Sequence, residues 1–424
     1  MPIDFTPSTE QEELRAGARE FAQTVLTEVK AATAGLAEAD ERFYALRPFY
    51  REMVRAGFLK GLLPTSVGGT YSGLLNQAIG GEEVACVDIN VPCTLFSCGL
   101  GLQPIIQFGT QEQQERLLAP FLVDDGEPLA AFAFTEVGGA ANFDSPDPTA
   151  GIQTIATLDG DEWVINGSKQ FTTNGTGWDG LGADLFTVVC RTDADLPPQE
   201  SLAVIAVDGR RPGIRVDGWL ETIGHRAALS PRVHFENVRV PAGNLIGQPG
   251  DGIEILSRTF SWTAPMVGTG SVGVMRAAFD CALEFTRSER RLGASPLIDH
   301  QNVGYMLGDI KTRIEASRYL TWKAAHYFDV TGGAGQELPV MAKVFCSETA
   351  VQVVYDAMRV VGVESYAAHL PLAGLMQDAL AFPLYDGGNM GMRRRQIHDF
   401  LRADGYDPLA GAASVASVPS PARV

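Results

Sequence analysis

A candidate catalytic pair lies near the C-terminus, in the segment Tyr385–Asn389 (YDGGN) and the arginine Arg393 that follows it. Two consecutive glycines let the backbone approach a ligand closely, because neither carries a Cβ. If a helix begins near Asn389, Arg393 lies about two turns beyond Asp386 on roughly the same face. A carboxylate base beside a fixed cation is suited to removing a proton from carbon, because the cation stabilises the anion that forms. The same residues would also form an ordinary turn before a solvated helix, so other segments must decide between the two interpretations.

Hydrophobic periodicity and turn signals divide the chain into three blocks around this pair. Residues 1–125 are predicted to form an N-terminal helical domain, with helices over 8–25, 48–61, 74–87, 94–108 and 111–122. Residues 126–245 alternate with a period of two and are predicted to form a β domain, with strands over 152–158, 162–165, 185–191, 202–207 and 233–240. Residues 246–409 are again helical, over 277–287, 303–327, 339–361 and 391–401, and residues 410–424 are predicted to be a flexible tail.

The composition is typical of a soluble enzyme and argues against several classes of function. The chain has 424 residues, 45% of them hydrophobic and 20% charged, and its formal net charge is −18. We expect no binding to nucleic acid or to an anionic membrane, because no basic stripe offsets this acidity. The six cysteines and six histidines are dispersed and offer no metal site. The sequence shows no signal peptide and no apolar run that we judge long enough to span a bilayer, which predicts a cytoplasmic protein.

Two segments of the β block together carry a resemblance to a flavoprotein family. The first is Thr135–Asn142 (TEVGGAAN), and the second is Asn166–Asn174 (NGSKQFTTN). A flavin needs hydrogen bonds along its pyrimidine edge and at N5, and a flat apolar wall against its ring. The hydroxyls of Thr135 and Thr173 and the ring of Phe171 could supply these contacts. Together with the helical, β, helical order of the blocks, both segments resemble the flavin-binding segments of the acyl-CoA dehydrogenase superfamily.

The resemblance implies a fold and a cofactor. The fold is of the α+β class, with an N-terminal α-helical domain, a middle β-barrel or sandwich domain and a C-terminal four-helix bundle, and the cofactor is FAD. A further segment, from Arg290 to Gln301, resembles the part of the superfamily that approaches the FAD pyrophosphate and adenine, often from a neighbouring subunit. Arg290 and Arg291 are competing candidates there, because one extra residue precedes His300, and we favour Arg291. The alternative is a helix-end arginine pair without a ligand.

The residues that the resemblance assigns to FAD binding come from all of these segments. They are Phe132, Phe134, Thr135, Phe171, Thr172, Thr173, Arg291, His300, Gln301, Arg359, Tyr385, Gly387 and Gly388.

Two departures separate the chain from general acyl-CoA dehydrogenases. Those enzymes have a glutamate base in a Y-E-G-T segment where this chain has Asp386, and a Ser-Asp pair where it has Ala141–Asn142. The segment around Asp386 and Arg393 instead resembles the nitroalkane oxidase family of the same superfamily, as do residues 47–52, 68–70, 126–130 and 177–179. This resemblance implies that Asp386 removes the α-proton, that Arg393 stabilises the nitronate that forms, and that Thr263 supplies an active-site hydroxyl.

Three further positions differ from that family and leave the shape of the pocket open. Val137 stands where a proline is usual, Phe134 replaces a histidine, and Trp262 replaces a methionine. A G-x-G-x-x-G sequence at Gly268–Gly273 is interpreted as close helix packing and not as a nucleotide loop, because no strand precedes it.

The predicted function is therefore FAD-dependent oxidation of nitroalkanes by O₂ to aldehydes or ketones, with release of nitrite and hydrogen peroxide, in a homotetramer. One alternative is an acyl-CoA dehydrogenase that uses an aspartate base on an unusual thioester and passes electrons to a carrier protein. A second alternative is a flavoprotein that kept the fold without catalysis. The three polar residues Asp386, Arg393 and Thr263 argue against the second.

Overall fold

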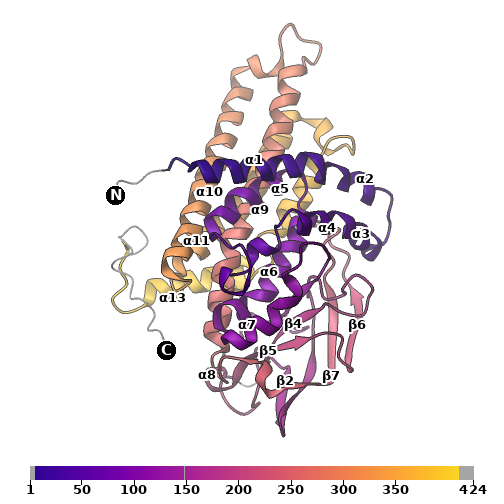
Figure 1. Cartoon of the computed structure of the whole chain (residues 1–424). Helices are drawn as coiled ribbons and strands as arrows, with labels where there is room; N and C mark the ends of the chain where they lie inside the picture. The colour runs from indigo at the N-terminus through magenta and orange to yellow at the C-terminus, as the bar shows by residue number, and fades with distance from the viewer. Residues whose placement is uncertain (1–4, 148, 410–424) are drawn as a thin grey trace.

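The computed structural model describes residues 5–147 and 149–409. In Figure 1 the strands lie at the lower right, the N-terminal helices cross the middle of the molecule, and a helical bundle rises to the top. This arrangement confirms the predicted α+β class with helical, β and helical parts. The predicted flexible tail, residues 410–424, lies outside the described residues.

The N-terminal part consists of helices joined by short turns. They are α1 (Thr9–Thr24), α2 (Val29–Thr33), α3 (Ala39–Ala45), α4 (Arg47–Arg55), α5 (Leu74–Val87), α6 (Asn90–Phe108) and α7 (Gln111–Leu118). The first helix begins where it does because of a capping box: the hydroxyl of Ser8 accepts from the amide of Gln11, whose side chain accepts from the amide of Ser8.

Helix α6 corrects one sequence prediction. We expected no apolar run of membrane-spanning length, but the 19 residues of α6 are long and apolar enough to cross a membrane by length and composition. In the fold α6 packs against strand β1 (Ala130–Ala133) and helix α9 (Gly252–Ser288), and 61% of its most apolar window is buried. A core helix of a soluble protein passes the same test, because burial inside a protein and burial in lipid select the same side chains.

The β domain is one mixed sheet. The remaining strands are β2 (Ile155–Asp159), β3 (Glu162–Lys169), β4 (Leu185–Arg191), β5 (Leu202–Asp208), β6 (Ile214–Trp219), β7 (Pro231–Pro241) and β8 (Leu245–Ile246). Their order is β6-β7-β3-β2-β4-β5-β8, and β1 pairs in parallel with β4. Asp159 pairs with Glu162 across a two-residue turn in which Gly160 has φ +66°, which is the predicted hairpin.

Several segments that carry the family resemblance meet where helices α3 and α4 contact the β domain. The ring of Trp178 stacks on that of Phe43 with centroids 4.6 Å apart, and its Nε1 donates to the carbonyl of Glu127 at 2.7 Å. The hydroxyl of Tyr50 donates to the carbonyl of Pro128 at 2.9 Å. These segments therefore fix the position of the sheet relative to the N-terminal helices.

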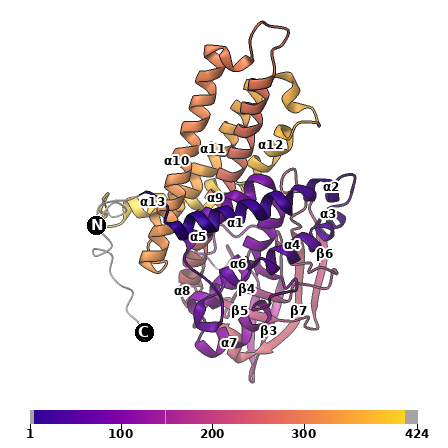
Figure 2. The same ribbon diagram turned by 45° about the horizontal axis from the view of Figure 1, so that its top comes forward.

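The C-terminal part is a bundle of long helices. Besides α9 it contains α10 (Gln301–Thr331), α11 (Glu337–Val361), α12 (Leu372–Ala381) and α13 (Arg394–Arg402), and Figure 2 shows α10, α11 and α12 rising beyond the N-terminal helices. The G-x-G-x-x-G sequence lies buried inside α9. A Cβ on Gly268 would lie 2.7 Å from Thr321 Oγ1, and one on Gly273 would lie 2.7 Å from the Cβ of Ala85. The interpretation as close helix packing is confirmed.

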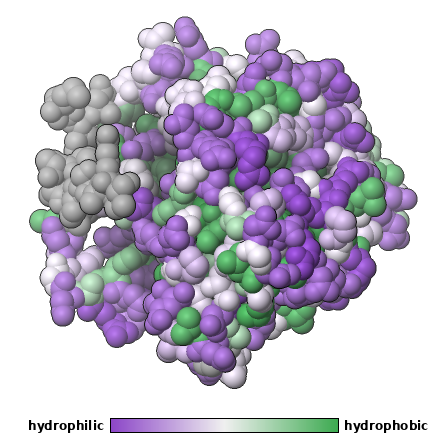
Figure 3. All heavy atoms as spheres, turned by 60° about the horizontal axis from the view of Figure 1, so that its bottom comes forward, coloured by the Kyte–Doolittle hydropathy of each residue, from purple (hydrophilic) through white to green (hydrophobic). Residues whose placement is uncertain are grey.

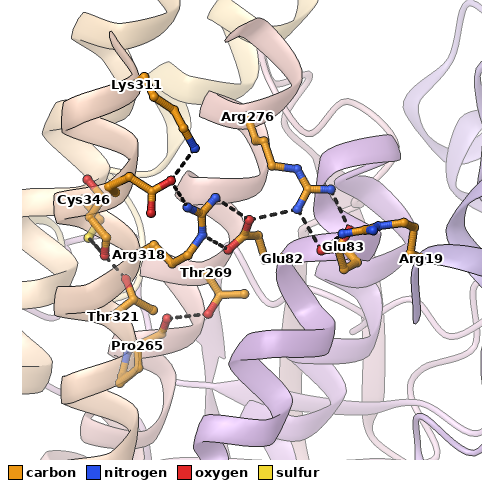
Figure 4. A network of polar contacts seen from close by, with 12 residues as sticks. Arg19, Glu82, Glu83, Pro265, Thr269, Arg276, Lys311, Arg318, Thr321 and Cys346 are labelled. Atoms are coloured by element: carbon orange, nitrogen blue, oxygen red, sulfur yellow. Dashed lines mark hydrogen bonds and ion pairs between the residues drawn. The ribbon is translucent and has the colours of Figure 1, made fainter. Parts of the chain in front are cut away.

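A buried ionic network ties four helices together (Figure 4). Glu82 and Glu83 of α5, whose side chains are almost fully buried, accept hydrogen bonds from Arg276 of α9 at 2.9 and 2.6 Å. Arg318 of α10 donates to Glu82 at 2.8 Å, and Arg19 of α1 donates to Glu83 at 3.0 Å. The network lines a surface cavity of about 670 Å³, and none of the predicted site residues belongs to that cavity.

Most of the visible surface is polar. The face in Figure 3 is covered largely by hydrophilic residues, with hydrophobic residues in small groups among them. Along α10, α11 and the turn after α11, however, several large side chains are exposed: Tyr305, Tyr319, Phe345, Tyr355, Val363 and Tyr366.

Candidate active site

The structure brings the three predicted catalytic residues together. The carboxylate of Asp386 lies in the loop between α12 and α13, and its side chain is 6% exposed. Its Oδ1 accepts a hydrogen bond from Thr263 Oγ1 at 2.6 Å, and its Oδ2 accepts one from Arg393 Nη2 at 2.7 Å. Thr263 belongs to α9, 123 residues earlier in the chain. Of the two interpretations of this segment, the structure therefore agrees with the pair: the carboxylate and the cation are buried against each other and are not part of a solvated turn.

The guanidinium of Arg393 is held on every side. Its side chain is 1% exposed, and its Nε donates to the backbone carbonyl of Asp386 at 2.9 Å. Nη2 also donates to the carbonyl of Phe260 at 3.3 Å, and Nη1 to Gln396 Oε1 at 3.2 Å. The guanidinium carbon lies 5.1 Å from the centre of the Phe260 ring, which adds a cation–π contact. A cation fixed in this way can stabilise developing negative charge without reorganising.

The two glycines after Asp386 serve the packing of this pair. Asp386 has φ +52° and Gly387 has φ +69°, so the loop passes through the left-handed region. A Cβ on Gly387 would lie 3.3 Å from Arg393 Nε, and one on Gly388 would lie 2.9 Å from the carbonyl oxygen of Leu384. The absent side chains therefore make room for Arg393 and for the chain itself. A contact of either glycine with FAD stays a prediction.

Tyr385 is an apolar wall beside the loop. Its ring lies 5.5 Å from that of His225 and 6.0 Å from that of Phe382, measured between centroids. Burial raises the pKa of Tyr385 well above its usual value, so the phenol stays neutral. Burial also lowers the pKa of His225 to about 4, so that its imidazole is neutral too.

The two predicted flavin segments are tied to each other by a buried ion pair that sequence reasoning missed. Lys169 Nζ of the second segment donates to Glu136 Oε1 of the first at 2.8 Å and to the carbonyl of Phe134 at 3.1 Å. Glu136 also accepts from the amide and hydroxyl of Thr154 at 2.9 and 2.6 Å. Glu136 and Lys169 therefore hold the two segments in register, although only the neighbouring hydroxyls and rings were predicted to matter.

The residues near these segments fit a flavin. Phe171 has φ +53° and its side chain is 48% exposed, an arrangement that costs free energy unless a ligand covers the ring. Thr172 Oγ1 is buried without a hydrogen-bond partner among the described residues, and Thr173 Oγ1 lies 2.8 Å from Ser230 Oγ. The exposed ring of Phe171 could pack against a flavin ring, and the two neighbouring hydroxyls could form hydrogen bonds with it.

Phe132 and Phe134 form the floor of the same region. They are 7% and 6% exposed, and both rings lie edge-on to Phe260, with centroids 5.9 and 5.5 Å apart. Phe260 is a residue that the sequence analysis did not single out, although it contacts Arg393 and both phenylalanines. Thr135, at the end of this stretch, accepts a backbone hydrogen bond from Gln170 at 2.8 Å and so joins the two flavin segments.

The second group of predicted flavin residues lies elsewhere. Arg291 and His300 lie in the loop between α9 and α10, which Figure 1 places at the top of the molecule. Thr263 is 25 residues before the last residue of α9, so at 1.5 Å per residue the two ends of this stretch are about 37 Å apart. The structure therefore does not bring Arg291, His300 and Gln301 together with Asp386 within one chain.

Within the chain, each of these distal residues contacts other residues at the same end of the helical bundle. Arg291 Nη1 pairs with Glu364 at 2.9 Å and its Nη2 donates to the carbonyl of Val361 at 2.9 Å, while Gln301 donates to the hydroxyl of Tyr305. Arg359, in the last turn of α11, pairs with Asp356 at 3.0 Å and is more than half exposed. The choice of Arg291 over Arg290 for the FAD pyrophosphate stays a prediction.

Comparison with known proteins agrees with this geometry. Residues 8–124, 131–238 and 250–401 match the N-terminal, middle and C-terminal domains of the acyl-CoA dehydrogenases. The chain is 39% identical to the nitroalkane oxidase of Podospora anserina and 37% identical to that of Fusarium oxysporum, over 96% of this chain and 98% and 97% of theirs. It is 32% identical, over 82% of this chain and 87% of the relative, to the cyclohexane-1-carbonyl-CoA dehydrogenase of Geobacter metallireducens.

Among solved structures too, nitroalkane oxidases are more similar to this chain than an acyl-CoA dehydrogenase is. The nitroalkane oxidase of Podospora anserina superposes with a TM-score of 0.91 at 38% identity, covering 96% of this chain and 99% of the other. Nitroalkane oxidase in complex with the competitive inhibitor spermine superposes with a TM-score of 0.92 at 36% identity and the same coverage, whereas the butyryl-CoA dehydrogenase of Megasphaera elsdenii reaches 0.84 at 26%, covering 95% of this chain and 100% of the other. The members of both groups are FAD flavoproteins. The chain therefore belongs to the acyl-CoA dehydrogenase superfamily and, within it, to the nitroalkane oxidase family.

Proposed function

We propose that the protein catalyses the FAD-dependent oxidation of nitroalkanes to aldehydes or ketones, with release of nitrite and hydrogen peroxide. The observation that carries this proposal is the buried carboxylate of Asp386, held by Thr263 on one oxygen and by Arg393 on the other. Such a site abstracts a proton from carbon, and a nitro group makes its α-carbon acidic enough for a carboxylate base.

Asp386 acts as the base in the first step. Each carboxylate oxygen has two lone pairs, and the hydrogen bonds from Thr263 and Arg393 use one on each, so a lone pair remains to accept the α-proton. As the proton moves, negative charge leaves Asp386 and develops on the nitro group of the substrate. The fixed guanidinium of Arg393 stabilises that charge, and the hydroxyl of Thr263 keeps the carboxylate oriented while the step proceeds.

When bound, FAD would supply the two-electron oxidation of the deprotonated substrate, with O₂ as the final electron acceptor. Phe171, Thr172 and Thr173 would hold its ring system, since they combine an exposed aromatic face with hydroxyl groups. Phe132, Phe134 and Phe260 exclude water from the region next to Arg393. In a dry site the attraction between the guanidinium and a developing anion is stronger than in water.

The relatives support the assignment of the pair. One nitroalkane oxidase structure concerns the roles of an arginine and an aspartate in the reaction of that flavoprotein, and the two residues stand seven positions apart in its chain. Asp386 and Arg393 have the same separation. Another structure is that of an active-site mutant in which an aspartate is replaced by asparagine, crystallised with 1-nitrooctane.

A second candidate function is dehydrogenation of a CoA thioester. The 32% identity to a cyclohexane-1-carbonyl-CoA dehydrogenase favours it. Against it stand the aspartate at position 386 and the Ala141–Asn142 pair, which replace the glutamate and the Ser-Asp of the thioester enzymes.

We also propose a homotetramer in which a neighbouring subunit completes each FAD site. Arg291, His300 and Gln301 lie about 37 Å of helix away from Thr263, so they can reach a flavin beside Asp386 only from another chain. The exposed aromatic residues on α10 and α11 supply apolar surface for such contacts. Sedimentation of the FAD-loaded protein as a monomer would contradict this proposal.

The test is the visible absorbance of the bound flavin. The purified protein is mixed anaerobically with nitroethane or 1-nitropropane, and air is admitted afterwards. Bleaching followed by recovery, with nitrite in solution, is the expected result. Bleaching by an acyl-CoA and not by the nitroalkanes would instead assign the protein to the thioester dehydrogenases.

A further inference from the structure

A fully buried lysine is hydrogen-bonded to the turn that carries Arg393. Lys343 of α11 is 0% exposed, and its Nζ donates to Asn389 Oδ1 at 2.7 Å. In the described part of the chain no carboxylate forms an ion pair with it. A buried ammonium group without a paired anion is costly. Lys343 lies beside the turn that carries Arg393, which suggests a role for the lysine in the candidate active site.

Asn389 connects the lysine to the catalytic loop. This residue is 2% exposed and begins the five-residue π-helical turn Asn389–Arg393. Its Nδ2 donates to Ser347 Oγ at 3.0 Å and to Glu348 Oε1 at 3.1 Å, both on α11. With its amide nitrogen engaged twice, the carboxamide can present only its oxygen to Lys343. The side chain of Asn389 thus fastens the start of the turn to α11, and Arg393 is the last residue of that turn.

We propose that Lys343 is a positioning residue of the active site, which holds through Asn389 the turn that presents Arg393 to Asp386. This proposal deepens the proposed function and rests on it. Lys343 does not touch the reacting atoms; it acts by fixing where the guanidinium of Arg393 lies. A shift of about 1 Å in such a group costs about 100-fold in rate, which sets the expected size of the effect.

The charge of Lys343 responds to the groups around it. Burial, and after it the positive charge of Arg393, lower the pKa of Lys343 to about 7, while Asp386 in the loop and Glu348 on α11 act in the opposite direction. Glu348 is itself bound by Arg394 of α13. Below this pH the ammonium form makes a charge-assisted hydrogen bond to Asn389, which is stronger than that of the neutral amine. Flavin reduction should therefore slow as the pH rises through about 7.

The experiment compares three variants with the wild-type protein, all loaded with FAD. Lys343→Met removes the charge and the donor at similar volume. Glu348→Gln removes a negative charge that raises the pKa of Lys343 but keeps an acceptor for Asn389, and it lies at a partly exposed position. Lys323→Met, at an exposed lysine of α10, is the matched control. The rate constant for anaerobic bleaching by nitroethane and its dependence on nitroethane concentration are measured from about pH 6 to 9.

We expect Lys343→Met to slow bleaching about 10- to 100-fold at saturating nitroethane, with a small change in the half-saturating concentration and no inflection near pH 7. Glu348→Gln should move the inflection to lower pH, and the Lys323→Met control should match the wild type. A wild-type rate and pH profile in Lys343→Met would overturn the proposal. If that variant does not fold, an inflection that Glu348→Gln leaves in place overturns it instead.

A second measurement separates this proposal from the proposed function. Because the pKa of Lys343 is about 7 in the folded protein and 10.5 is its ordinary value, the unfolded chain binds one more proton between these limits. The stability of the wild type relative to Lys343→Met should therefore rise with pH in that window, and thermal midpoints record it without any substrate. A midpoint difference that is constant with pH would contradict the lowered pKa of Lys343 and with it the pH dependence that the proposal predicts. A wild-type protein that nitroethane does not bleach would overturn the proposed function.

Discussion

Replacing Asp386 by asparagine isolates the role of the base. In the wild type its two oxygens accept from Thr263 at 2.6 Å and from Arg393 at 2.7 Å. In the Asp386→Asn protein the amide oxygen can face the guanidinium, and the amide nitrogen can then donate to the threonine hydroxyl. That hydroxyl has a second acceptor ready, the carbonyl of Phe260 at 3.2 Å. The local hydrogen bonds can therefore be kept while the base is lost.

The expected magnitudes follow from these contacts. Loss of a positioned general base costs about 10²- to 10⁴-fold in rate, which corresponds to about 3 to 5 kcal/mol in the barrier. Breaking a buried ion pair from one side costs about 3 to 5 kcal/mol of stability. We expect less here, about 1 to 3 kcal/mol, because Arg393 keeps the carbonyls of residues 386 and 260, the side chain of Gln396 and the ring of Phe260. The variant should thus fold, retain FAD and melt only moderately earlier.

The assay is anaerobic flavin bleaching with two forms of one substrate. Neutral nitroethane requires a base, and the preformed anion of nitroethane does not. Asp386→Asn should lose its reaction with the neutral form and keep much of its reaction with the anion. Asp399→Asn, at an exposed aspartate of α13, is the control for the substitution itself. Equal losses with both forms of nitroethane would refute the assignment of Asp386 as the base.

Two further predictions concern the loop and the ionic network. Gly387→Ala places a Cβ 3.3 Å from Arg393 Nε on a residue with φ +69°, which costs about 1 to 2 kcal/mol. We expect this variant to lower kcat/KM about tenfold. The control is Gly391→Ala, whose Cβ meets only an ordinary contact and should leave kcat/KM unchanged. Burial raises the pKa of Glu83, but hydrogen bonds from Arg276 and a second arginine outweigh it and lower the pKa to about 2. Because this folded-state pKa lies below the ordinary value of 4.5, the contribution of Glu83 to stability is complete above about pH 4.5 and is lost toward pH 2. The difference in thermal midpoint between wild type and Glu83→Gln should therefore shrink over that range, and a constant difference would contradict it.

Periodic segments of the fold were predictable, and short ones were not. Helix α5 spans the predicted residues 74–87 and strand β4 the predicted 185–191, because each has a long apolar pattern between clear boundaries. Strand β1 was missed because its four residues, Ala130–Ala133, are too few to form a recognisable pattern, whereas β4 is an equally buried run of seven. The ten-residue helix α12 was missed as well, between segments without strong signals. Helix α9 spans Gly252–Ser288, so the predicted segment 277–287 is only its last part, and the glycines at 268–273 belong to the same helix, as the interpretation as helix packing requires.

The grouping of the three candidate catalytic residues was predictable from the family resemblance, but the groups that support it were not. Asp386, Arg393 and Thr263 stand in recognisable motifs, and the structure brings them within hydrogen-bond distance. Lys343 stands in an ordinary helical stretch, and only the fold places it beside Asn389. A sequence pattern records the spacing along one element, whereas a buried pair between two elements depends on how they pack.

Three consecutive arginines, the last residue of the π-helical turn and the first two of α13, illustrate this limit. Successive residues of a helix point about 100° apart, so three identical side chains face three different neighbours. Arg393 binds Asp386, Arg394 binds Glu348 of α11 at 2.6 Å, and Arg395 donates to the carbonyl of Ala141 at 2.8 Å. The run therefore joins the base, the helix that carries Lys343 and the end of the first flavin segment. What the sequence presents as one cationic cluster is therefore a junction that fixes the position of the Asp386 carboxylate relative to α11 and to the first predicted flavin segment.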